Sequence, residues 1–320
     1  MNDQPTKKPP TNLGHEHPLY VLPFDHRFPY ACEVFGFAEA MSGEQVAQAA
    51  ALKQVIYEAL GQAIAAGLPA HQAAVLVDER FGAAILRDAA SHGLTTILPI
   101  EKSGVAEFTL DYGEQFAEHI ARFDPTFVKV LVQLNPEGDA ARNARQLAQL
   151  VAVSDHCRSV QRQFMFELIV PPEASQLSAL GGDREKFDLE VRPALMVEAI
   201  EHIQDAGIEP DVWKIEGLDS RDDCRRVADA VRRGDRDNVG CVVLGRGENE
   251  ARVRHWLETA AATPGFIGFA VGRSIFAAPL VALRAGQTTH AAAAAEIAGR
   301  FRRLVDTFEH ARGPAARSGA

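Results

Sequence analysis

Eight short apolar runs, rich in β-branched residues, recur along the chain and have the length of β-strands. Between them lie longer stretches in which apolar residues recur three and four positions apart, the spacing of an amphipathic helix. The predicted strands are residues 19–24, 74–78, 95–100, 126–132, 164–170, 210–216, 239–245 and 266–272. The predicted helices include 43–66, 81–92, 139–153, 194–206, 219–233, 248–261 and an Ala-rich terminal segment at 291–295. Strand and helix therefore alternate about eight times.

This alternation is typical of parallel strands that are joined by crossover helices. A count of eight favours a closed (β/α)8 barrel, and the length of 320 residues suits one such domain. An open, doubly wound sheet is the alternative. We predict a single barrel over residues 18–312, with disordered tails at 1–17 and 313–320.

The composition limits the partners of the protein. A net charge of −10 and a pI near 5.6 disfavour nucleic acid and anionic membrane surfaces, although a pocket can still be locally positive. The start of the chain lacks the apolar core of a signal peptide, and no later stretch of 18 residues is apolar without a charge. We therefore expect a soluble, cytoplasmic protein without a membrane partner. Four separated cysteines are predicted to be buried thiols: Cys32, Cys157, Cys224 and Cys241.

Charged residues interrupt or follow most of the predicted strands. In a closed α/β barrel the active site lies at the carboxyl ends of the strands, so these residues are the candidates for chemistry. They are Asp25, His26, Arg27, Asp78, Glu79, Arg80, Glu101, Lys102, Lys129, Glu167, Lys214, Glu216, Arg246 and Arg273.

Lysine is rare among the 33 basic residues of the chain, yet three lysines fall at predicted strand ends: Lys102, Lys129 and Lys214. Arginine stays protonated, whereas a desolvated lysine amine can lose its proton and form a Schiff base. This pattern predicts a nucleophilic amine. The alternative for Lys214 is a buried ion pair with Glu216 or Glu167, and the alternative for Lys129 is a side chain that extends to solvent.

Glu167 lies within an apolar strand, between Phe166 and Leu168. A carboxylate in such surroundings is costly unless it is paired or functional. We expect it to be functional, with a pKa that is raised by its apolar neighbours.

The strand-end motifs together resemble a known family. PFDHR, VLVDERFG, PIEKSG, FVKVL, FELIVPP, PDVWKIEG, VLGRGENE and GFAVGRSIF occur in this order. Over about residues 18–310 they closely resemble the aldolase-like C-terminal domain of the bifunctional 5-dehydro-2-deoxygluconokinases of inositol catabolism. More distantly they are similar to the tagatose bisphosphate aldolases, class I barrels with a catalytic lysine on the sixth strand. The kinase half has no counterpart in the sequence, so no phosphotransfer from ATP is expected.

The resemblance implies roles for individual residues. Lys214 would be the Schiff-base lysine, Glu167 the acid/base carboxylate, and Lys129 the neighbouring cation that helps Lys214 to lose its proton. Asp25 and Lys102 match positions that line the site, and His26 and Arg27 are further lining candidates. Phosphate is expected at the loops after the seventh and eighth strands, at Gly245, Arg246, Gly272 and Arg273. No cofactor and no metal are expected.

The implied reaction is cleavage of 2-deoxy-5-keto-gluconate 6-phosphate to malonate semialdehyde and dihydroxyacetone phosphate. A first alternative keeps the chemistry but takes a ketohexose bisphosphate. A second is a metal-dependent aldolase, suggested by the pair His15 and His17. A third is a non-catalytic barrel that senses a sugar phosphate. Outer helices of such barrels often associate, which makes a homo-oligomer an expectation.

Overall fold

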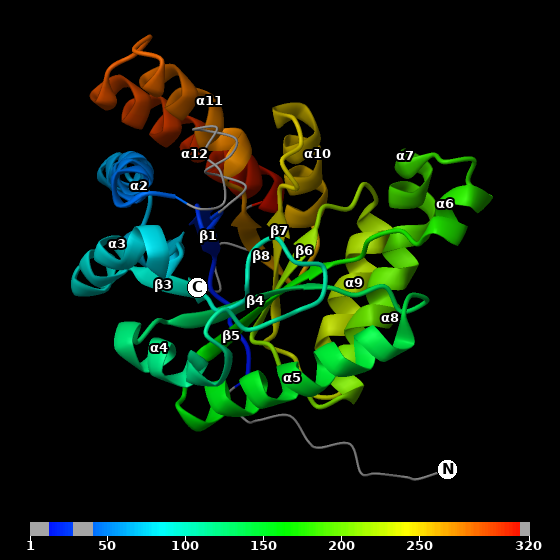
Figure 1. Cartoon of the computed structure of the whole chain (residues 1–320). Coiled ribbons are helices and arrows are strands. Elements are labelled where there is room, and N and C mark those ends of the chain that lie inside the picture. The colour runs from blue at the N-terminus through cyan, green and yellow to red at the C-terminus, as the bar shows by residue number, and fades with distance from the viewer. Residues whose placement is uncertain (1–12, 28–40, 314–320) are drawn as a thin grey trace, which may run out of the picture.

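Eight parallel strands form a closed barrel in the computed structural model, which describes residues 13–27 and 41–313 (Figure 1). Each strand pairs with the next, and β8 closes the ring on β1. The strands are β1 (Leu19–Pro23), β2 (Ala73–Leu76), β3 (Thr95–Pro99), β4 (Phe127–Gln133), β5 (Gln163–Ile169), β6 (Val212–Glu216), β7 (Gly240–Leu244) and β8 (Phe266–Ala270). The predicted (β/α)8 barrel is confirmed, and the open sheet is wrong because the ring is complete.

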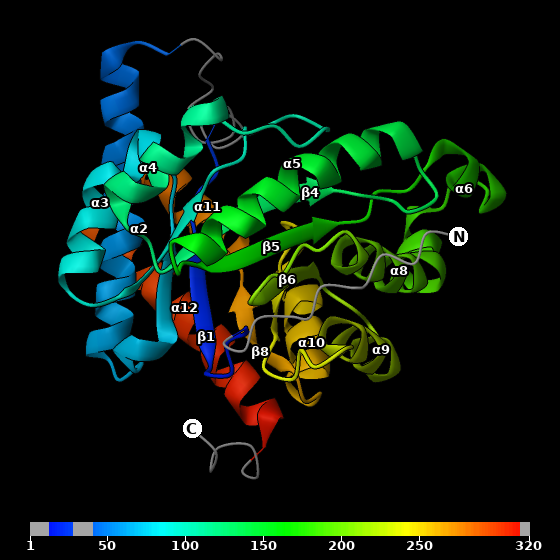
Figure 2. The ribbon, with the colours of Figure 1, turned by 90° about the horizontal axis from the view of Figure 1, so that it is seen from below.

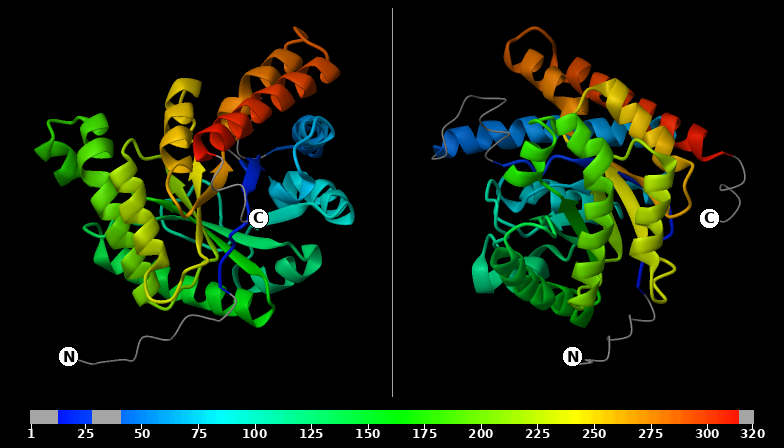
Figure 3. Two further views of the ribbon diagram at one scale, coloured as in Figure 1. Left: turned by 180° about the vertical axis from the view of Figure 1, so that it is seen from behind. Right: turned by 90° about the vertical axis from the view of Figure 1, so that its right-hand side faces the viewer.

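Helices surround the barrel on its outside (Figure 2). The longer ones are α2 (Gly43–Ala65), α3 (Glu79–Ser91), α4 (Phe116–Phe123), α5 (Ala140–Ser159), α8 (Arg192–Asp205), α9 (Arg221–Arg232), α10 (Glu250–Ala261), α11 (Arg273–Arg284) and α12 (His290–Arg312). Between β5 and α8 lie the short helices α6 (Ala174–Ala179) and α7 (Arg184–Lys186) and the π-helical turn η3 (Phe187–Val191). Helix α12 packs against α2, α10 and α11, and it runs beside α11 in both views of Figure 3.

Side-chain caps account for several helix starts that the apolar pattern located only approximately. Ser42 forms a capping box with Gln45 at the start of α2. Asp78 accepts a hydrogen bond from the backbone of Phe81 at the start of α3, and Asn249 caps α10 in the same way. Such caps satisfy N–H groups that have no acceptor within the helix.

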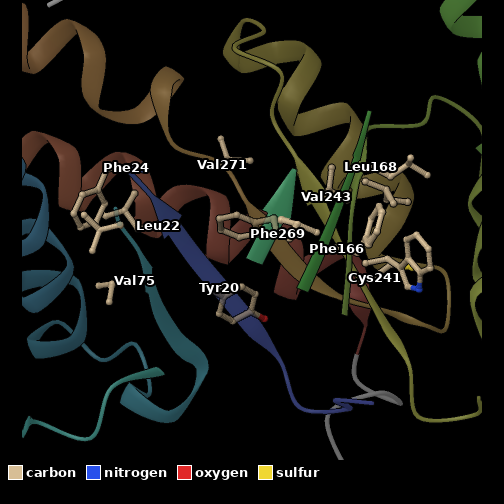
Figure 4. Packing of buried hydrophobic residues seen from close by; sticks show 14 of the residues in the cluster. Tyr20, Leu22, Phe24, Val75, Phe166, Leu168, Cys241, Val243, Phe269 and Val271 are labelled. Atoms are coloured by element: carbon tan, nitrogen blue, oxygen red, sulfur yellow. The ribbon is translucent and has the colours of Figure 1, made fainter. Parts of the chain in front are cut away.

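Two apolar layers make up the core. Residues such as Tyr20, Leu22, Phe166 and Phe269 lie between the strands and the helices (Figure 4). Alternate residues of the same strands point into the barrel, where they form a second cluster of Leu19, Val21, Ala74, Leu76, Ile97, Phe127, Met165, Val212, Val242, Ile267 and Ala270. The two-residue period of a strand therefore decides which side chains face the barrel interior.

The segment before β1 is held against the amino ends of the strands. The backbone N–H of Gly14 donates to Oδ1 of Asp211 at 2.9 Å, and that of His15 donates to the carbonyl of Asn238 at 2.8 Å. The ring of His15 lies 5.4 Å from that of Phe127. The prediction of a disordered tail over 1–17 is therefore wrong for residues 13–17, whose polar backbone groups find partners on the barrel. Residues 1–12 and 314–320 lie outside the described residues.

The cysteines that the structure describes are free, buried thiols: Cys157, Cys224 and Cys241. Burial raises the pKa of each thiol to about 12, so each stays protonated and unreactive. The prediction is confirmed for these three, whereas Cys32 lies outside the described residues. Within the described part of the chain, no helix is long and apolar enough to cross a membrane.

Candidate active site

Three charged side chains lie next to the apolar layer inside the barrel, on the side of the carboxyl ends of the strands. Phe127, Met165 and Val212 belong to that layer, and the residues two positions later in the same strands are Lys129, Glu167 and Lys214. Because strand residues two apart share a face, these charges also point inward, nearer the carboxyl ends. Register then pairs Glu167 of β5 directly with Lys214 of β6. Local periodicity and strand order together bring the three side chains into one cluster.

The carboxylate of Glu167 bridges the two lysines. Its Oε1 lies 2.8 Å from Nζ of Lys214, and its Oε2 lies 2.7 Å from Nζ of Lys129. All three side chains are buried. The ion pair between Lys214 and Glu167 that we considered as an alternative is present, and it is also the contact that a proton transfer between amine and carboxylate requires.

The expected raised pKa of Glu167 is wrong. Burial by itself raises the pKa of this carboxyl, but the ammonium groups of Lys129 and Lys214 outweigh burial and hold the pKa below its ordinary value. The residues next to Glu167 in the sequence are apolar, so the sequence indicated only the effect of burial on its pKa. The two compensating cations belong to adjacent strands, so only the closed barrel reveals them.

Lys129 is surrounded by carboxylates. Its Nζ lies 3.1 Å from Oδ2 of Asp25 and 3.0 Å from Oε1 of Glu101, in addition to the contact with Glu167. Burial would lower the pKa of this amine, but the three carboxylates together raise it above its ordinary value. The pKa of Asp25 is likewise held below its ordinary range, because Lys129 and Lys214 outweigh its burial. Lys129 is therefore a permanent cation within the cluster.

Arg27 supports this cluster from the side. Its guanidinium is buried, with Nη2 at 3.2 Å from Oε1 of Glu101 and Nη1 at 2.9 Å from Oδ2 of Asp111. Arg27 was predicted to line the site for substrate, and it does line a cavity there, but its charge is already engaged by two carboxylates. Its contacts are those of a residue that positions Glu101.

Two adjoining cavities open at the carboxyl ends of the strands, and both are lined by His26, Glu167 and Lys214. The first measures about 290 Å³ and lies toward β7 and β8, where Gly245, Arg246, Gly247, Gly272, Arg273 and Ser274 line it. The second measures about 430 Å³ and lies toward β3 and β4, where it is lined by Asp25, Arg27, Glu101, Lys102, Lys129 and Gln133, among others. Burial lowers the pKa of His26 to about 4, so a neutral imidazole lies between the two cavities at neutral pH.

The first cavity has the features of an anion site. Helix α11 begins there at Arg273, directly after Gly272, and helix N-termini present N–H groups and a positive dipole to anions. A Cβ on Gly272 would lie 2.0 Å from the carbonyl oxygen of Pro23, so the close approach of β1 requires glycine. At the other side, Nη1 of Arg246 lies 2.8 Å from Oδ2 of Asp188 and its Nε lies 3.0 Å from Oε1 of Glu216.

The structure brings all eleven predicted site residues to this end of the barrel, around one or other of the two cavities. Lys102 is exposed at the rim of the second cavity, on a hairpin that the bridge between Glu101 and Leu110 closes. Glu101 was among our strand-end candidates for chemistry, directly before Lys102, but it was given no role. Gly247 and Ser274 were given no role either, because no sequence signal distinguished them from ordinary turn residues. Within residues 13–27 and 41–313, no group of three His, Cys, Asp or Glu side chains is arranged to hold a metal ion.

Fold and site together define a closed (β/α)8 barrel protein with a lysine–carboxylate–lysine cluster at the carboxyl ends of its strands. Over residues 9–312 the chain matches the family described as "Uncharacterized protein conserved in bacteria (DUF2090)", and it belongs to that family. A comparison with curated protein sequences gives no match.

Solved structures share the fold. One is a fructose-bisphosphate aldolase from Plasmodium falciparum, with a TM-score of 0.65 at 13% identity over 92% of this chain and 91% of that one. Another is the protein Cgl0159 from Corynebacterium glutamicum, with a TM-score of 0.55 at 18% identity over 92% of this chain and 88% of that one. At these identities the similarity shows a common barrel fold, and the resemblance to the kinase-fused domains of inositol catabolism stays a prediction.

Proposed function

We propose that the protein is a class I aldolase in which Lys214 forms a Schiff base with the ketone of a phosphorylated keto sugar acid. The observation that carries the proposal is the position of the Lys214 amine. It lies where the two cavities meet, 2.8 Å from the carboxylate of Glu167 and close to the cation Lys129. An amine and a proton-transfer group in contact, with space for substrate on both sides, are what imine chemistry requires.

Glu167 and Lys129 would divide the supporting roles. To attack the ketone, Lys214 must lose a proton, and Glu167 is in contact to accept it. Glu167 would then return that proton to the carbinolamine oxygen, which leaves as water when the imine forms. Lys129 stays charged, so it stabilises the carboxylate form of Glu167 without competing for the ketone.

The phosphate of the substrate would occupy the first cavity. Gly245, Arg246, Gly272 and Arg273 come from the loops after β7 and β8, where (β/α)8 barrels frequently bind phosphate. With phosphate there and the ketone at Lys214, the remainder of the substrate extends into the second cavity, past His26 toward Asp25 and Lys102. This arrangement suits 2-deoxy-5-keto-gluconate 6-phosphate, which would yield malonate semialdehyde and dihydroxyacetone phosphate.

The other functions considered differ in measurable ways. A ketohexose bisphosphate aldolase would use the same imine, and relative kcat/KM values for the two substrates decide between them. The metal-dependent alternative was suggested by His15 and His17, but these lie at the amino ends of the strands and do not line the cavities around Lys214. A sugar-phosphate sensor would bind ligand without forming an imine.

Borohydride trapping tests the proposal directly. The protein is incubated with dihydroxyacetone phosphate and sodium borohydride, and peptide mass spectrometry locates any reduced adduct. We expect one adduct, on Lys214, and unchanged turnover in excess EDTA. Absence of an adduct on any lysine would contradict the imine mechanism and favour the sensor or metal-dependent chemistry.

A further inference from the structure

The second cavity contains a carboxylate whose chemistry the imine-forming steps do not use. Given the proposed function, on which this inference rests, the bond that breaks joins the carbon next to the imine to a carbon bearing a hydroxyl group. A base must accept the proton of that hydroxyl as the carbon–carbon bond breaks. Phosphate in the first cavity places this hydroxyl in the second cavity, beyond Lys214.

Three carboxylates line the second cavity: Asp25, Glu101 and Glu167. Both oxygens of Glu167 lie within 3 Å of lysine amines, 2.8 Å from Lys214 and 2.7 Å from Lys129. Asp25 is in contact with Lys129 at 3.1 Å, and the two lysines hold its pKa below the ordinary range. Both carboxylates are therefore already engaged by lysine ammonium groups.

Glu101 and Glu167 each have a buried oxygen without a hydrogen-bond partner in the described part of the chain, but that of Glu167 lies 2.7 Å from Nζ of Lys129. Oε1 of Glu101 is shared by Arg27 at 3.2 Å and Lys129 at 3.0 Å. Its Oε2 is buried and has no hydrogen-bond partner among residues 13–27 and 41–313. Glu101 as a whole residue is 5% exposed. Leaving a carboxylate oxygen buried and unpartnered costs free energy, unless a ligand or a proton occupies it.

The surroundings of Glu101 favour proton uptake. Burial raises the pKa of this carboxyl and outweighs the opposing effects of Lys129 and Arg27. Its backbone is fixed by the bridge to Leu110, and Arg27 is in turn held by Asp111 at 2.9 Å. The unpartnered oxygen of Glu101 is therefore held rigidly, and Glu101 is the most basic of the three carboxylates that line this cavity.

We propose that Glu101 is a catalytic residue, the base that accepts the proton of the substrate hydroxyl when the carbon–carbon bond breaks. The O–H proton moves to Oε2 of Glu101, and the hydroxyl oxygen becomes the carbonyl of the departing aldehyde. The electron pair of the broken bond moves into the iminium on Lys214 and gives an enamine. Once the aldehyde has left, the enamine carbon takes up a proton and hydrolysis releases dihydroxyacetone phosphate.

A partial reaction separates this step from imine chemistry. Dihydroxyacetone phosphate alone forms the imine and the enamine, so the protein should exchange a proton of its hydroxymethyl carbon with deuterated water, which NMR follows. That exchange needs Lys214 but no aldehyde. In Glu101→Gln we expect exchange within about threefold of wild type and cleavage of 2-deoxy-5-keto-gluconate 6-phosphate slower by about 100-fold or more.

Matched variants make the result decisive. Glu107→Gln removes a carboxylate of the same hairpin that pairs with Arg145 at 2.8 Å, outside the second cavity, and should leave both rates near wild type. Glu101→Asp keeps a carboxylate, so it should recover part of the cleavage rate, and it also serves if the glutamine variant does not fold.

Three results would overturn the proposal: cleavage by Glu101→Gln within tenfold of wild type, an equal loss of exchange and cleavage, or a cleavage-selective loss in Asp25→Asn instead. A wild-type protein that neither exchanges nor traps an adduct would instead refute the aldolase function itself.

Discussion

Nζ of Lys214 lies 2.8 Å from Oε1 of Glu167, and the two residues are register partners on β6 and β5. Adjacent parallel strands place register partners about 5 Å apart with their side chains on the same face. The contact is therefore built into the barrel wall and needs no loop movement to form. A rigid wall is a suitable place for groups that must exchange a proton in a fixed geometry.

Replacing Lys214 by arginine should abolish the reaction while keeping the charge beside Glu167. Arginine cannot form an imine, because its guanidinium stays protonated. We expect turnover to fall by about 10³-fold or more and the borohydride adduct to disappear. Lys186→Arg, on the short helix α7 outside both cavities, is the control and should retain both properties. Normal turnover by Lys214→Arg would exclude this lysine as the nucleophile.

Glu167→Gln should slow formation of the imine. Glutamine keeps the size of the side chain and one acceptor oxygen, but it cannot carry a proton between the amine and the carbinolamine. General acid/base catalysis contributes about 10²- to 10⁴-fold, so kcat should fall within that range with a smaller change in KM. Rapid-quench borohydride trapping should show the adduct on Lys214 forming more slowly. A variant that traps the adduct at the wild-type rate would assign the proton transfer to another group.

Arg246→Gln should weaken binding of phosphorylated ligands. The guanidinium lines the first cavity, and Asp188 and Glu216 hold it there. A charge-assisted hydrogen bond contributes about 1.5–3 kcal/mol, so KM should rise by about 10- to 100-fold while kcat changes little. The control is Arg252→Gln, an arginine on α10 that pairs with Asp219 and does not line the cavity. Equal effects of the two substitutions would contradict a local role of Arg246 in phosphate binding.

The amino end of the barrel should show a pH-dependent stability through Asp211. Burial raises the pKa of this carboxyl to about 6, although backbone N–H groups of Gly14 and Phe164 donate to it. The pKa of Asp211 is higher in the folded than in the unfolded state. The stabilisation of the folded state that comes from this shift is therefore complete below about pH 4 and is lost as the pH rises through about 6.

Urea unfolding at pH 4.5 and 7.5 measures this effect by comparing wild type with Asp211→Asn. The stability of wild type relative to the variant should fall by about 2 kcal/mol between the two pH values, since one pKa unit corresponds to about 1.4 kcal/mol. A difference that is independent of pH would show that Asp211 titrates alike in the folded and unfolded states.

Much of the site was predictable because it depends on local periodicity. Alternation in single strands determines that Lys129, Glu167 and Lys214 share the inner face with Phe127, Met165 and Val212, and strand order places their carboxyl ends together. Such features need only neighbouring residues and the rule that barrel sites lie at the carboxyl ends. The helix starts were less precise, because capping side chains such as Asp78 and Asn249 act outside the apolar pattern.

The choice of partners was decided by tertiary structure alone. Both Glu167 and Glu216 were candidates to pair with Lys214, and the fold assigns Glu216 to Arg246 and to the backbone N–H of Val170. The lowered pKa of Glu167 and the contact of Glu101 with Lys129 likewise depend on charges from other strands. The positions of the strands and the faces that carry charge follow from the sequence by itself, because they depend only on local periodicity. Electrostatic effects act through space over a few ångströms, between residues that can lie far apart in the sequence. Which charges meet, and how strongly each shifts the protonation of the next, follow only from the closed barrel.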